Sequence, residues 1–304
     1  MSTAPNFGTS PSGFFAWLSR RFRGRRKLSM LSTLGAPVLW MLVVYIGSLA
    51  LLVVAAFFKA GKSGKTTTKL TGENIRQALT TSEFVRTVLR SVCVALGVTA
   101  LCFAIALPMA FYIAKVAKTR HRRRMIVAVL LPLWAGYLVK GYAWKSIIAP
   151  DSGKLAAKPG GGFLEATIGW TPGYGPLAVV LTLTYLWLPY MVLPIYAGLE
   201  RLAPSYLDAS GDLGARPLRT FRSVIMPLLV PSIAAGSIFT FALSLGDYIT
   251  PKIITGGKFQ MIGSLIDSLQ QTNPAISAAL TLWPIAIIIV YLVGMARLRA
   301  FENI

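Results

Sequence analysis

The chain has 304 residues, of which 55% are hydrophobic and 13% charged, whereas a soluble globular chain carries about 25% charged residues. The 31 Lys and Arg against 10 Asp and Glu give a formal net charge of +21. So apolar a composition predicts an integral membrane protein, and it excludes a nucleic-acid-binding protein despite the excess of basic residues.

The first element in chain order is residues 1–27, a segment that ends in the basic cluster from Arg20 to Lys27. Ser, Pro and Gly are frequent in residues 1–19, and the uncharged stretch after the cluster is longer than the apolar region of a signal peptide. We therefore predict an uncleaved basic segment in the cytoplasm, followed by a transmembrane domain over residues 28–304.

Uncharged stretches predict the membrane helices, because about 20 apolar residues are needed to cross the hydrocarbon core of a bilayer. Five stretches are long enough outright, and a sixth qualifies if Lys140 is tolerated. We therefore predict an all-α integral membrane fold with six helices. The predicted spans are residues 34–58, 84–114, 125–148, 176–199, 224–248 and 275–297.

The distribution of basic residues predicts the orientation, because short cytoplasmic loops retain Lys and Arg. With the N-terminus inside, the basic residues of 20–27, 115–124, 201–222 and 297–299 all lie in the cytoplasm. The lysines of residues 59–69 run against this assignment. The sequence thus predicts a multi-pass protein of the cell membrane with both termini in the cytoplasm.

Residue patterns for catalysis or metal binding are missing from the sequence. Cys93 and Cys102 have no partner cluster, and the single histidine, His121, lies in a basic loop. The run from Gly61 to Thr66 lacks the first glycine of a phosphate-binding loop. We therefore expect no enzyme activity, no metal site and no cofactor in this chain.

The loop 200–223 between the fourth and fifth spans is longer than a simple turn. Pro204 and Ser205 favour the start of a short helix, and Gly214 followed by Pro217 favours its end. Apolar residues such as Tyr206 and Leu213 stand among charges there, which is typical of a surface that binds another protein. A helix lying on the lipid surface is the alternative interpretation.

This loop resembles the cytoplasmic signature of the transmembrane subunits of ATP-binding-cassette (ABC) importers, which reads Glu-Ala-Ala-x3-Gly-x9-Ile-x-Leu-Pro. The chain has Asp208-Ala209-Ser210, then Gly214, then Val224-Ile225-Met226-Pro227, at the same spacing. Four positions differ from the signature: Asp for Glu, Ser for the second Ala, Val for Ile and Met for Leu. The resemblance implies the type I importer permease fold, with a cytoplasmic coupling helix between the fourth and fifth spans.

The resemblance also implies partners and a mechanism. The coupling helix would seat in a cleft of a cytoplasmic ATPase dimer, so that closure of the ATPases moves the membrane helices as rigid bodies. A second permease subunit, an extracytoplasmic solute-binding protein and the lipid bilayer are the other partners implied, and nucleic acid is not among them. The residues assigned to ATPase coupling are Tyr206, Asp208, Ala209, Ser210, Gly214, Ala215, Arg216 and Pro227.

From about residue 80 onward the chain is most similar to polyamine (spermidine and putrescine) permeases. The runs that carry this similarity are Leu131–Trp134, Leu138–Trp144, Leu188–Pro194 and Ser244–Pro251, together with Gly256-Gly257. Related permeases for opines, amino-acid derivatives, iron or thiamine share some of these runs, so another small solute is an alternative. A stand-alone secondary transporter or channel is a further alternative, which the loop 200–223 argues against.

A path for polyamines is expected to offer carboxylates to ammonium groups and aromatic faces for cation–π contacts. Asp247 with Tyr248, near the outer end of the fifth span, is the first candidate. The alternative is that Asp247 caps a helix or forms a salt bridge to Lys140 or Lys252.

Aromatic residues at helical spacing supply the remaining candidates for the path. Trp134, Tyr137 and Trp144 are expected on one face of the third span, and Tyr185, Trp187 and Tyr190 cluster in the fourth. We name Trp134, Tyr137, Tyr185 and Tyr190 as pathway candidates, with packing or a membrane-interface belt as the alternative role.

Overall fold

The computed structural model describes residues 26–60, 66–150 and 162–297, in two units that divide after Val54. In the first unit the described structure is helix α2 (Arg26–Ala56), whose stretch Pro37–Ala56 is long and apolar enough to cross a membrane. Residues 1–25, most of the predicted basic segment, lie outside the described residues.

The second unit is helical apart from one small hairpin in the described ranges. Its elements are β1 (Phe58–Ala60), β2 (Thr66–Leu70), α3 (Glu73–Thr80), α4 (Ser82–Phe111), η1 (Tyr112–Val116), α5 (Thr119–Trp134), α6 (Tyr137–Ile147), α7 (Phe163–Ile168), α8 (Pro176–Arg201), α9 (Pro204–Asp212), α10 (Pro217–Thr220), η3 (Phe221–Ile225), α11 (Met226–Leu245), α12 (Ile249–Thr255), α13 (Ile262–Thr272) and α14 (Pro274–Arg297).

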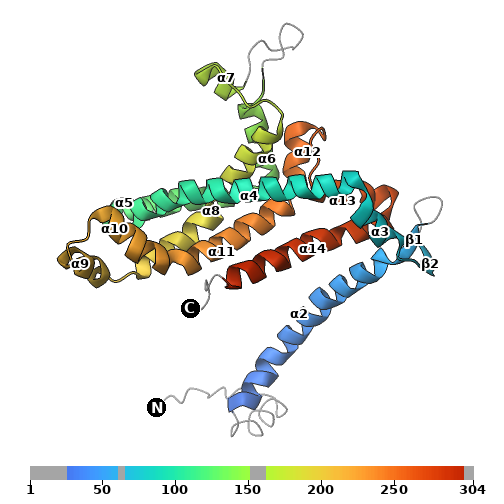
Figure 1. Cartoon of the computed structure of the whole chain (residues 1–304), viewed down its shortest axis with the longest axis horizontal. Helices are drawn as coiled ribbons and strands as arrows, with labels where there is room; N and C mark the ends of the chain where they lie inside the picture. Colours follow the sequence, from blue (N-terminus) through green and yellow to red (C-terminus); the bar gives the residue numbers. More distant parts are fainter. Residues whose placement is uncertain (1–25, 61–65, 151–161, 298–304) are drawn as a thin grey trace, which may run out of the picture. The chain divides into compact units, whose positions relative to one another are not determined.

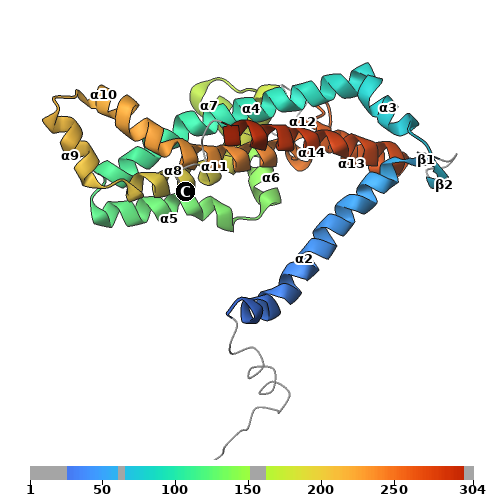
Figure 2. The same ribbon diagram turned by 60° about the horizontal axis from the view of Figure 1, so that its bottom comes forward.

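Four long helices, α4, α8, α11 and α14, run side by side along the second unit (Figures 1 and 2). Helices α9 and α10 lie at one end of them, called the α9 end below, and α3, α13 and the hairpin lie at the other, called the α13 end (Figure 1). Across the described residues, five helices pass the length and hydropathy test for a membrane span, and α5 with α6 forms a sixth, bent candidate. The predicted all-α membrane fold is confirmed.

The small hairpin of β1 and β2 was not predicted from the sequence. Its two strands are antiparallel, with Ala60 opposite Thr66, and the Thr-rich sequence of β2 suits a strand because β-branched residues pack well on a pleated surface. The Asn74 side chain of α3 donates hydrogen bonds to the carbonyls of Ala56 and Phe58, at 2.9 and 2.7 Å. These bonds fix the base of the hairpin against α3.

The third predicted span, residues 125–148, is divided into two helices. Between α5 and α6, Ala135 and Gly136 adopt extended backbone conformations with ψ of 136° and 142°, and the helix axes meet at 98°. Pro132, which lacks a backbone N–H, lies just before this break. The expectation that Trp134 shares one helical face with Tyr137 is therefore wrong, because the two residues belong to different helices.

The core of the second unit forms where α4, α8 and α11 pack on one another. A Cβ atom at Gly236 of α11 would lie 2.8 Å from the Met191 sulfur and 3.2 Å from the Met191 Cα of α8. This glycine therefore permits the close approach of the two helices, as small residues commonly do between membrane helices.

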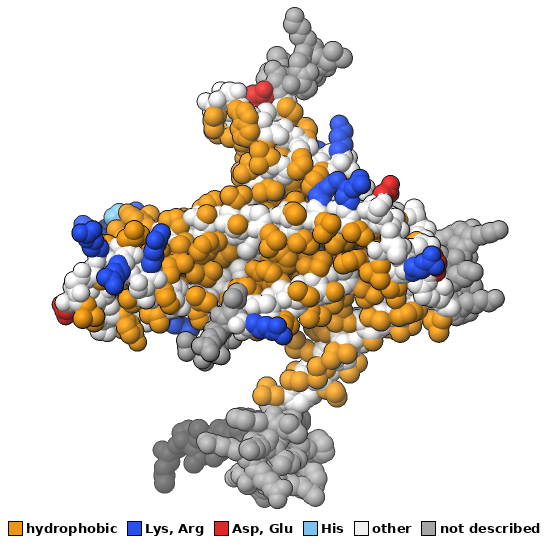
Figure 3. Space-filling model, viewed as in Figure 1, with side chains coloured by type: hydrophobic (Ala, Val, Ile, Leu, Met, Phe, Trp, Pro, Cys, Tyr) orange, Lys and Arg blue, Asp and Glu red, His pale blue; other side chains and the backbone are white. Residues whose placement is uncertain are grey.

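A second buried cluster joins α14 to α3, α11 and α13, and includes a stacked ring pair of Phe241 and Tyr291 at 4.3 Å. Outside these cores the long helices present large apolar side chains to the surroundings, as the hydrophobic side chains along their length in Figure 3 show. Such exposure suits contact with lipid, in which an apolar surface carries no cost of hydration.

Candidate functional site

The short helix α9 is the first candidate site, and its limits follow from its sequence. Pro204 occupies the first turn, where its missing N–H is not needed. After Asp212 the chain turns through Gly214, whose φ is +72°, and the N–H groups of Gly214 and Ala215 donate to the carbonyls of Gly211 and Ser210. This is the Schellman arrangement, in which glycine is favoured at the left-handed position.

The predicted coupling residues take different positions around α9. Tyr206, Asp208 and Ala209 are exposed, and so are Arg216 and Pro227 further along the chain. Ser210 instead is buried, and its hydroxyl hydrogen-bonds the Thr220 hydroxyl at 2.8 Å. An open cavity of about 360 Å³ brings several of them together, lined by Tyr206, Ala209, Ser210, Leu213, Ala215, Arg219, Ser223 and Val224.

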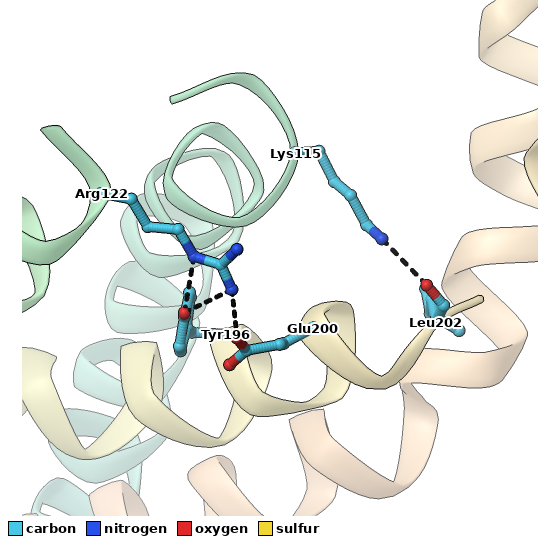
Figure 4. Close-up of polar contacts among 5 residues, drawn as sticks. All are labelled: Lys115, Arg122, Tyr196, Glu200 and Leu202. Atoms are coloured by element: carbon cyan, nitrogen blue, oxygen red, sulfur yellow. Dashed lines mark hydrogen bonds and ion pairs between the residues drawn. The ribbon is translucent and has the colours of Figure 1, made fainter. Parts of the chain in front are cut away.

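A group of polar contacts holds the chain just before α9 (Figure 4). The Arg122 guanidinium of α5 donates to the Tyr196 hydroxyl of α8 from Nε at 2.8 Å and from Nη2 at 2.7 Å, and it pairs with the Glu200 carboxylate. The Lys115 ammonium of η1 donates to the Leu202 carbonyl at 3.1 Å. We call these five residues the Arg122 clamp.

The Arg122 clamp fixes the C-terminal end of α8. Leu202 follows the last residue of α8, where backbone carbonyls lack helical partners and the helix dipole is negative. The cation of Lys115 is therefore well placed at this carbonyl. Sequence reasoning assigned Lys115 and Arg122 only to the orientation of the chain, because their partners lie 74 to 87 residues away.

The second candidate site is an open cavity of about 300 Å³, which we call the Asp247 cavity. It is lined by Tyr137, Trp187, Ala242, Leu243, Gly246, Asp247, Tyr248 and Ile249. Among these lining residues Asp247 alone carries a charge, and it is 7% exposed.

Four neutral donors hold the Asp247 carboxylate. The backbone N–H groups of Ile249 and Thr250 donate to Oδ1 at 2.9 and 3.0 Å, which caps the start of α12. The Thr250 hydroxyl donates to Oδ2 at 2.7 Å, and the Tyr137 hydroxyl of α6 donates to the same oxygen. The capping role considered for Asp247 is thus present. Lys252, one of the bridging partners considered, instead pairs with Asp267 at 3.3 Å.

Aromatic rings surround this carboxylate on one side. The rings of Tyr137 and Trp187 stack at 5.9 Å, and Tyr190 packs against Trp187 at 5.7 Å. Tyr185 contacts Trp144 at 5.3 Å and does not line the cavity, while Trp134 is 91% exposed at the end of α5. The structure therefore brings Asp247, Tyr248 and Tyr137 to one cavity, with Tyr190 behind it, and leaves Tyr185 and Trp134 outside.

Among the aromatic and polar residues of this site, Trp187 and Thr250 are the two that sequence reasoning did not select. Thr250 follows Asp247 by three residues, the spacing of a capping contact, which was the available signal. Trp187 stood in the aromatic cluster of the fourth span, but nothing in the sequence shows which member of such a cluster faces a cavity. Its indole Nε1 is buried, and no part of the chain that the structure describes accepts a hydrogen bond from it.

Several known proteins are similar to this chain. It is 40% identical over 295 residues to the inner membrane ABC transporter permease protein YdcU of Escherichia coli K12, which covers 90% of this chain and 91% of YdcU. It is 30% identical over 186 residues to the spermidine/putrescine transport system permease protein PotB of the same strain, covering 59% of this chain and 64% of PotB. The molybdenum transport system permease protein ModB of Mycobacterium bovis is 30% identical over 220 residues, covering 71% and 80%.

Solved structures share the fold. A chain of a bacterial ABC transporter involved in the import of alginate superposes with a TM-score of 0.70 at 12% identity, covering 93% of this chain and 99% of that one. A chain of the MetNI methionine ABC transporter gives a TM-score of 0.53 at 14% identity, over 70% and 93% of the two chains. Residues 10–300 match the family described as binding-protein-dependent transport system inner membrane component, and the chain belongs to that family of ABC importer permeases.

Proposed function

We propose that this permease carries polyamines such as spermidine and putrescine into the cell. It forms the substrate path with a second permease, is driven by a pair of cytoplasmic ATPases, and receives its substrate from an extracytoplasmic binding protein. Both termini and the α9 end lie in the cytoplasm. The observation that carries the proposal is the Asp247 carboxylate, held among aromatic rings at the wall of an open cavity.

The charge of this site favours a cation. All four donors to Asp247 are neutral, so they fix the position of the carboxylate without cancelling its negative charge. Because the site is buried, the field of this charge is screened less than at an exposed position. An ammonium group in the cavity would be attracted, and an anionic solute would be repelled.

The remaining walls suit a flexible chain of methylene groups between ammonium groups. Leu243 and Ile249 supply apolar surface, and the faces of Tyr137, Trp187 and Tyr248 supply sites for a cation within reach of a ring. Cation–π contacts contribute roughly 0.5–2 kcal/mol each, with the larger values where water is excluded. The similarity to PotB supports the same substrate class.

Uptake of labelled spermidine and putrescine tests the proposal, in cells that lack this chain and express either the native sequence or Asp247→Asn. Asparagine keeps an oxygen that can cap α12 and removes the charge. Its NH2 group replaces the oxygen that accepts from Tyr137 and Thr250, and it can donate to those two hydroxyl oxygens instead. We expect the native chain to restore uptake and Asp247→Asn to reduce it at least tenfold. Asp267→Asn, which removes an exposed carboxylate paired with Lys252, is the matched control and should behave as native.

Two results would contradict the proposal. If the native chain restores no polyamine uptake, the substrate class is wrong, although the family remains. If Asp247→Asn transports as well as the native chain, the substrate path does not depend on this carboxylate.

The α9 helix is the proposed contact with the ATPases. Tyr206 on this helix and Leu213 directly after it are 54% and 88% exposed, and Asp208 is exposed beside them. Exposed apolar side chains next to charges are typical of a protein-binding surface. We expect Asp208→Lys to prevent co-purification of the ATPase and to abolish uptake. Asp212→Lys, on the same helix but at a position that the signature leaves unspecified, is the control and should retain both.

A further inference from the structure

We propose that α5 and α6 act as a lever between the α9 end and the Asp247 cavity, with Arg122 as the positioning residue that attaches the lever to the end of α8, just before α9. The proposal rests on the proposed coupling role of α9. It adds the route by which a movement of α9 reaches the cavity, and this route does not depend on which solute is carried.

One end of the lever is attached by the Arg122 clamp. Arg122 belongs to the first turn of α5, and its guanidinium contacts Tyr196 by two hydrogen bonds and lies 5.3 Å from the centre of the Tyr196 ring. Tyr196 and Glu200 occupy the last two turns of α8, from which the chain passes into α9 within three residues. The contacts drawn in Figure 4 join the end of α8 to α5, so a displacement of α9 that moves the end of α8 would pull on α5.

The other end of the lever reaches the cavity. Tyr137 is the first residue of α6, and its hydroxyl donates to the Asp247 carboxylate and contacts the Thr250 hydroxyl at 2.5 Å. Helix α6 also packs on α12, the helix that Asp247 caps. A movement of the start of α6 thus shifts a wall of the cavity and changes the hydrogen bonds of the Asp247 carboxylate.

The connection from the Arg122 clamp to the Asp247 cavity is short and mostly helical. From Arg122 to Trp134 the chain is continuous α-helix, a length of about 18 Å at 1.5 Å per residue. Only Ala135 and Gly136 separate α5 from α6, and both are extended. Short joints between rigid helices are where hinge motions occur, so a shift along α5 becomes a swing of α6 at the 98° bend.

The exposure of the clamp separates this role from a role in folding. The Arg122 and Glu200 side chains are 28% and 53% exposed. Ion pairs this exposed contribute little to stability. Loss of the Arg122 contacts should therefore leave a folded protein that binds its ATPase, and the loss should appear in the response of the cavity.

A thiol reporter in the cavity tests the lever in the complete transporter. Leu243 lines the cavity and is replaced by cysteine in a Cys93→Ser background, since Cys93 is exposed whereas Cys102 is buried. The rate of labelling by a thiol-specific maleimide is measured in membrane vesicles without nucleotide and with ATP plus vanadate. The ratio of the two labelling rates measures how strongly the nucleotide state of the ATPases changes access to the cavity. The measurement needs no transported solute.

We expect Arg122→Gln to reduce this nucleotide-dependent ratio by about 2- to 30-fold, the range found when one coupling contact is removed. ATPase co-purification and ATP hydrolysis should persist. Arg123→Gln is the matched control, because Arg123 is the next residue, is exposed, and has no hydrogen bond or ion pair within the described ranges. Tyr137→Phe, which removes the hydroxyl at the far end of the lever, should lower the ratio as Arg122→Gln does.

The exchange Arg122→Glu with Glu200→Arg provides the rescue. The ion pair is retained with its charges reversed, and the Tyr196 hydroxyl can donate to the new carboxylate, so part of the response should return. An unchanged ratio in Arg122→Gln would overturn the lever, as would a native chain whose labelling does not respond to nucleotide. Neither result bears on polyamine uptake, which is measured separately.

Discussion

The α9 end and the Asp247 cavity are built in opposite ways. At the α9 end most of the candidate coupling side chains are exposed, with Ser210 as a buried exception, and the Arg122–Glu200 pair is in contact with solvent. At the cavity a single buried carboxylate is surrounded by four donors and three aromatic rings. We therefore expect that the surface at the α9 end can be altered without unfolding the protein, whereas changes at the cavity also disturb contacts of the fold.

Removing the carboxylate completely gives the largest expected effect. Asp247→Ala loses the cap of α12, worth about 0.5–2 kcal/mol, and leaves the buried hydroxyls of Tyr137 and Thr250 without an acceptor, at about 1–3 kcal/mol for each group that finds no other partner. We expect a marked fall in the melting temperature of the purified protein, measured by scanning fluorimetry in detergent. Asp247→Asn should lower it much less.

The matched control for this change is Asp267→Ala, which removes a carboxylate that is 38% exposed. A melting temperature for Asp247→Ala equal to that of Asp267→Ala would show that the Asp247 contacts do not support the fold. The cavity and the fold would then not depend on the same contacts.

A second change tests the scaffold that joins the two regions. Gly236→Val places a branched side chain against Met191, where even a Cβ would lie 2.8 Å from the sulfur. Overpacking of this kind costs about 1–3 kcal/mol. Gly294→Val is the control, because the space around Gly294 of α14 is open. We expect Gly236→Val to lower thermal stability and uptake, and Gly294→Val to change neither. Equal behaviour of the two variants would argue against a tight α8–α11 contact.

A third change separates the turn after α9 from the helix itself. Gly214→Ala puts an L-residue at φ +72°, which costs about 1–2 kcal/mol although the surrounding space is open. Gly211→Ala, the same substitution inside α9, favours the helix by up to about 1 kcal/mol. We expect Gly214→Ala to weaken ATPase binding in a pull-down titration and Gly211→Ala to leave it intact. Gly214→Asn should be milder, because asparagine tolerates this conformation.

The elements that the sequence predicted correctly are those with local signals. The α9 helix and its turn were predicted because their signals are local: Pro204 at the start, Gly214 in the left-handed position, and a fixed spacing to Pro227. The long membrane helices were predicted for the same reason, since an uncharged stretch needs no knowledge of its neighbours.

The features that were not predicted depend on contacts between distant segments. Arg122 hydrogen-bonds Tyr196, which is 74 residues further along the chain. Tyr137 hydrogen-bonds Asp247, which is 110 residues further along. The bend between α5 and α6 had local signals in Pro132 and Gly136, but the length of an apolar stretch in which Lys140 was tolerated outweighed them. Hydrophobicity alone predicts that a segment enters the membrane, and it does not predict whether the segment stays straight.

The smallest expected effect concerns the stability contributed by the Arg122 clamp. For a pair as exposed as Arg122 and Glu200, double-mutant cycles give about 0.2–1 kcal/mol. We expect Arg122→Gln and Glu200→Gln, alone and together, to shift the melting temperature by only a few degrees, and the shift to shrink in high salt because the ions screen the pair. A large, salt-independent loss of stability would mean that the clamp is part of the folded core. In that case the α9 end and the Asp247 cavity would be built alike, and the effect of Arg122→Gln on the cavity would follow from damage to the fold.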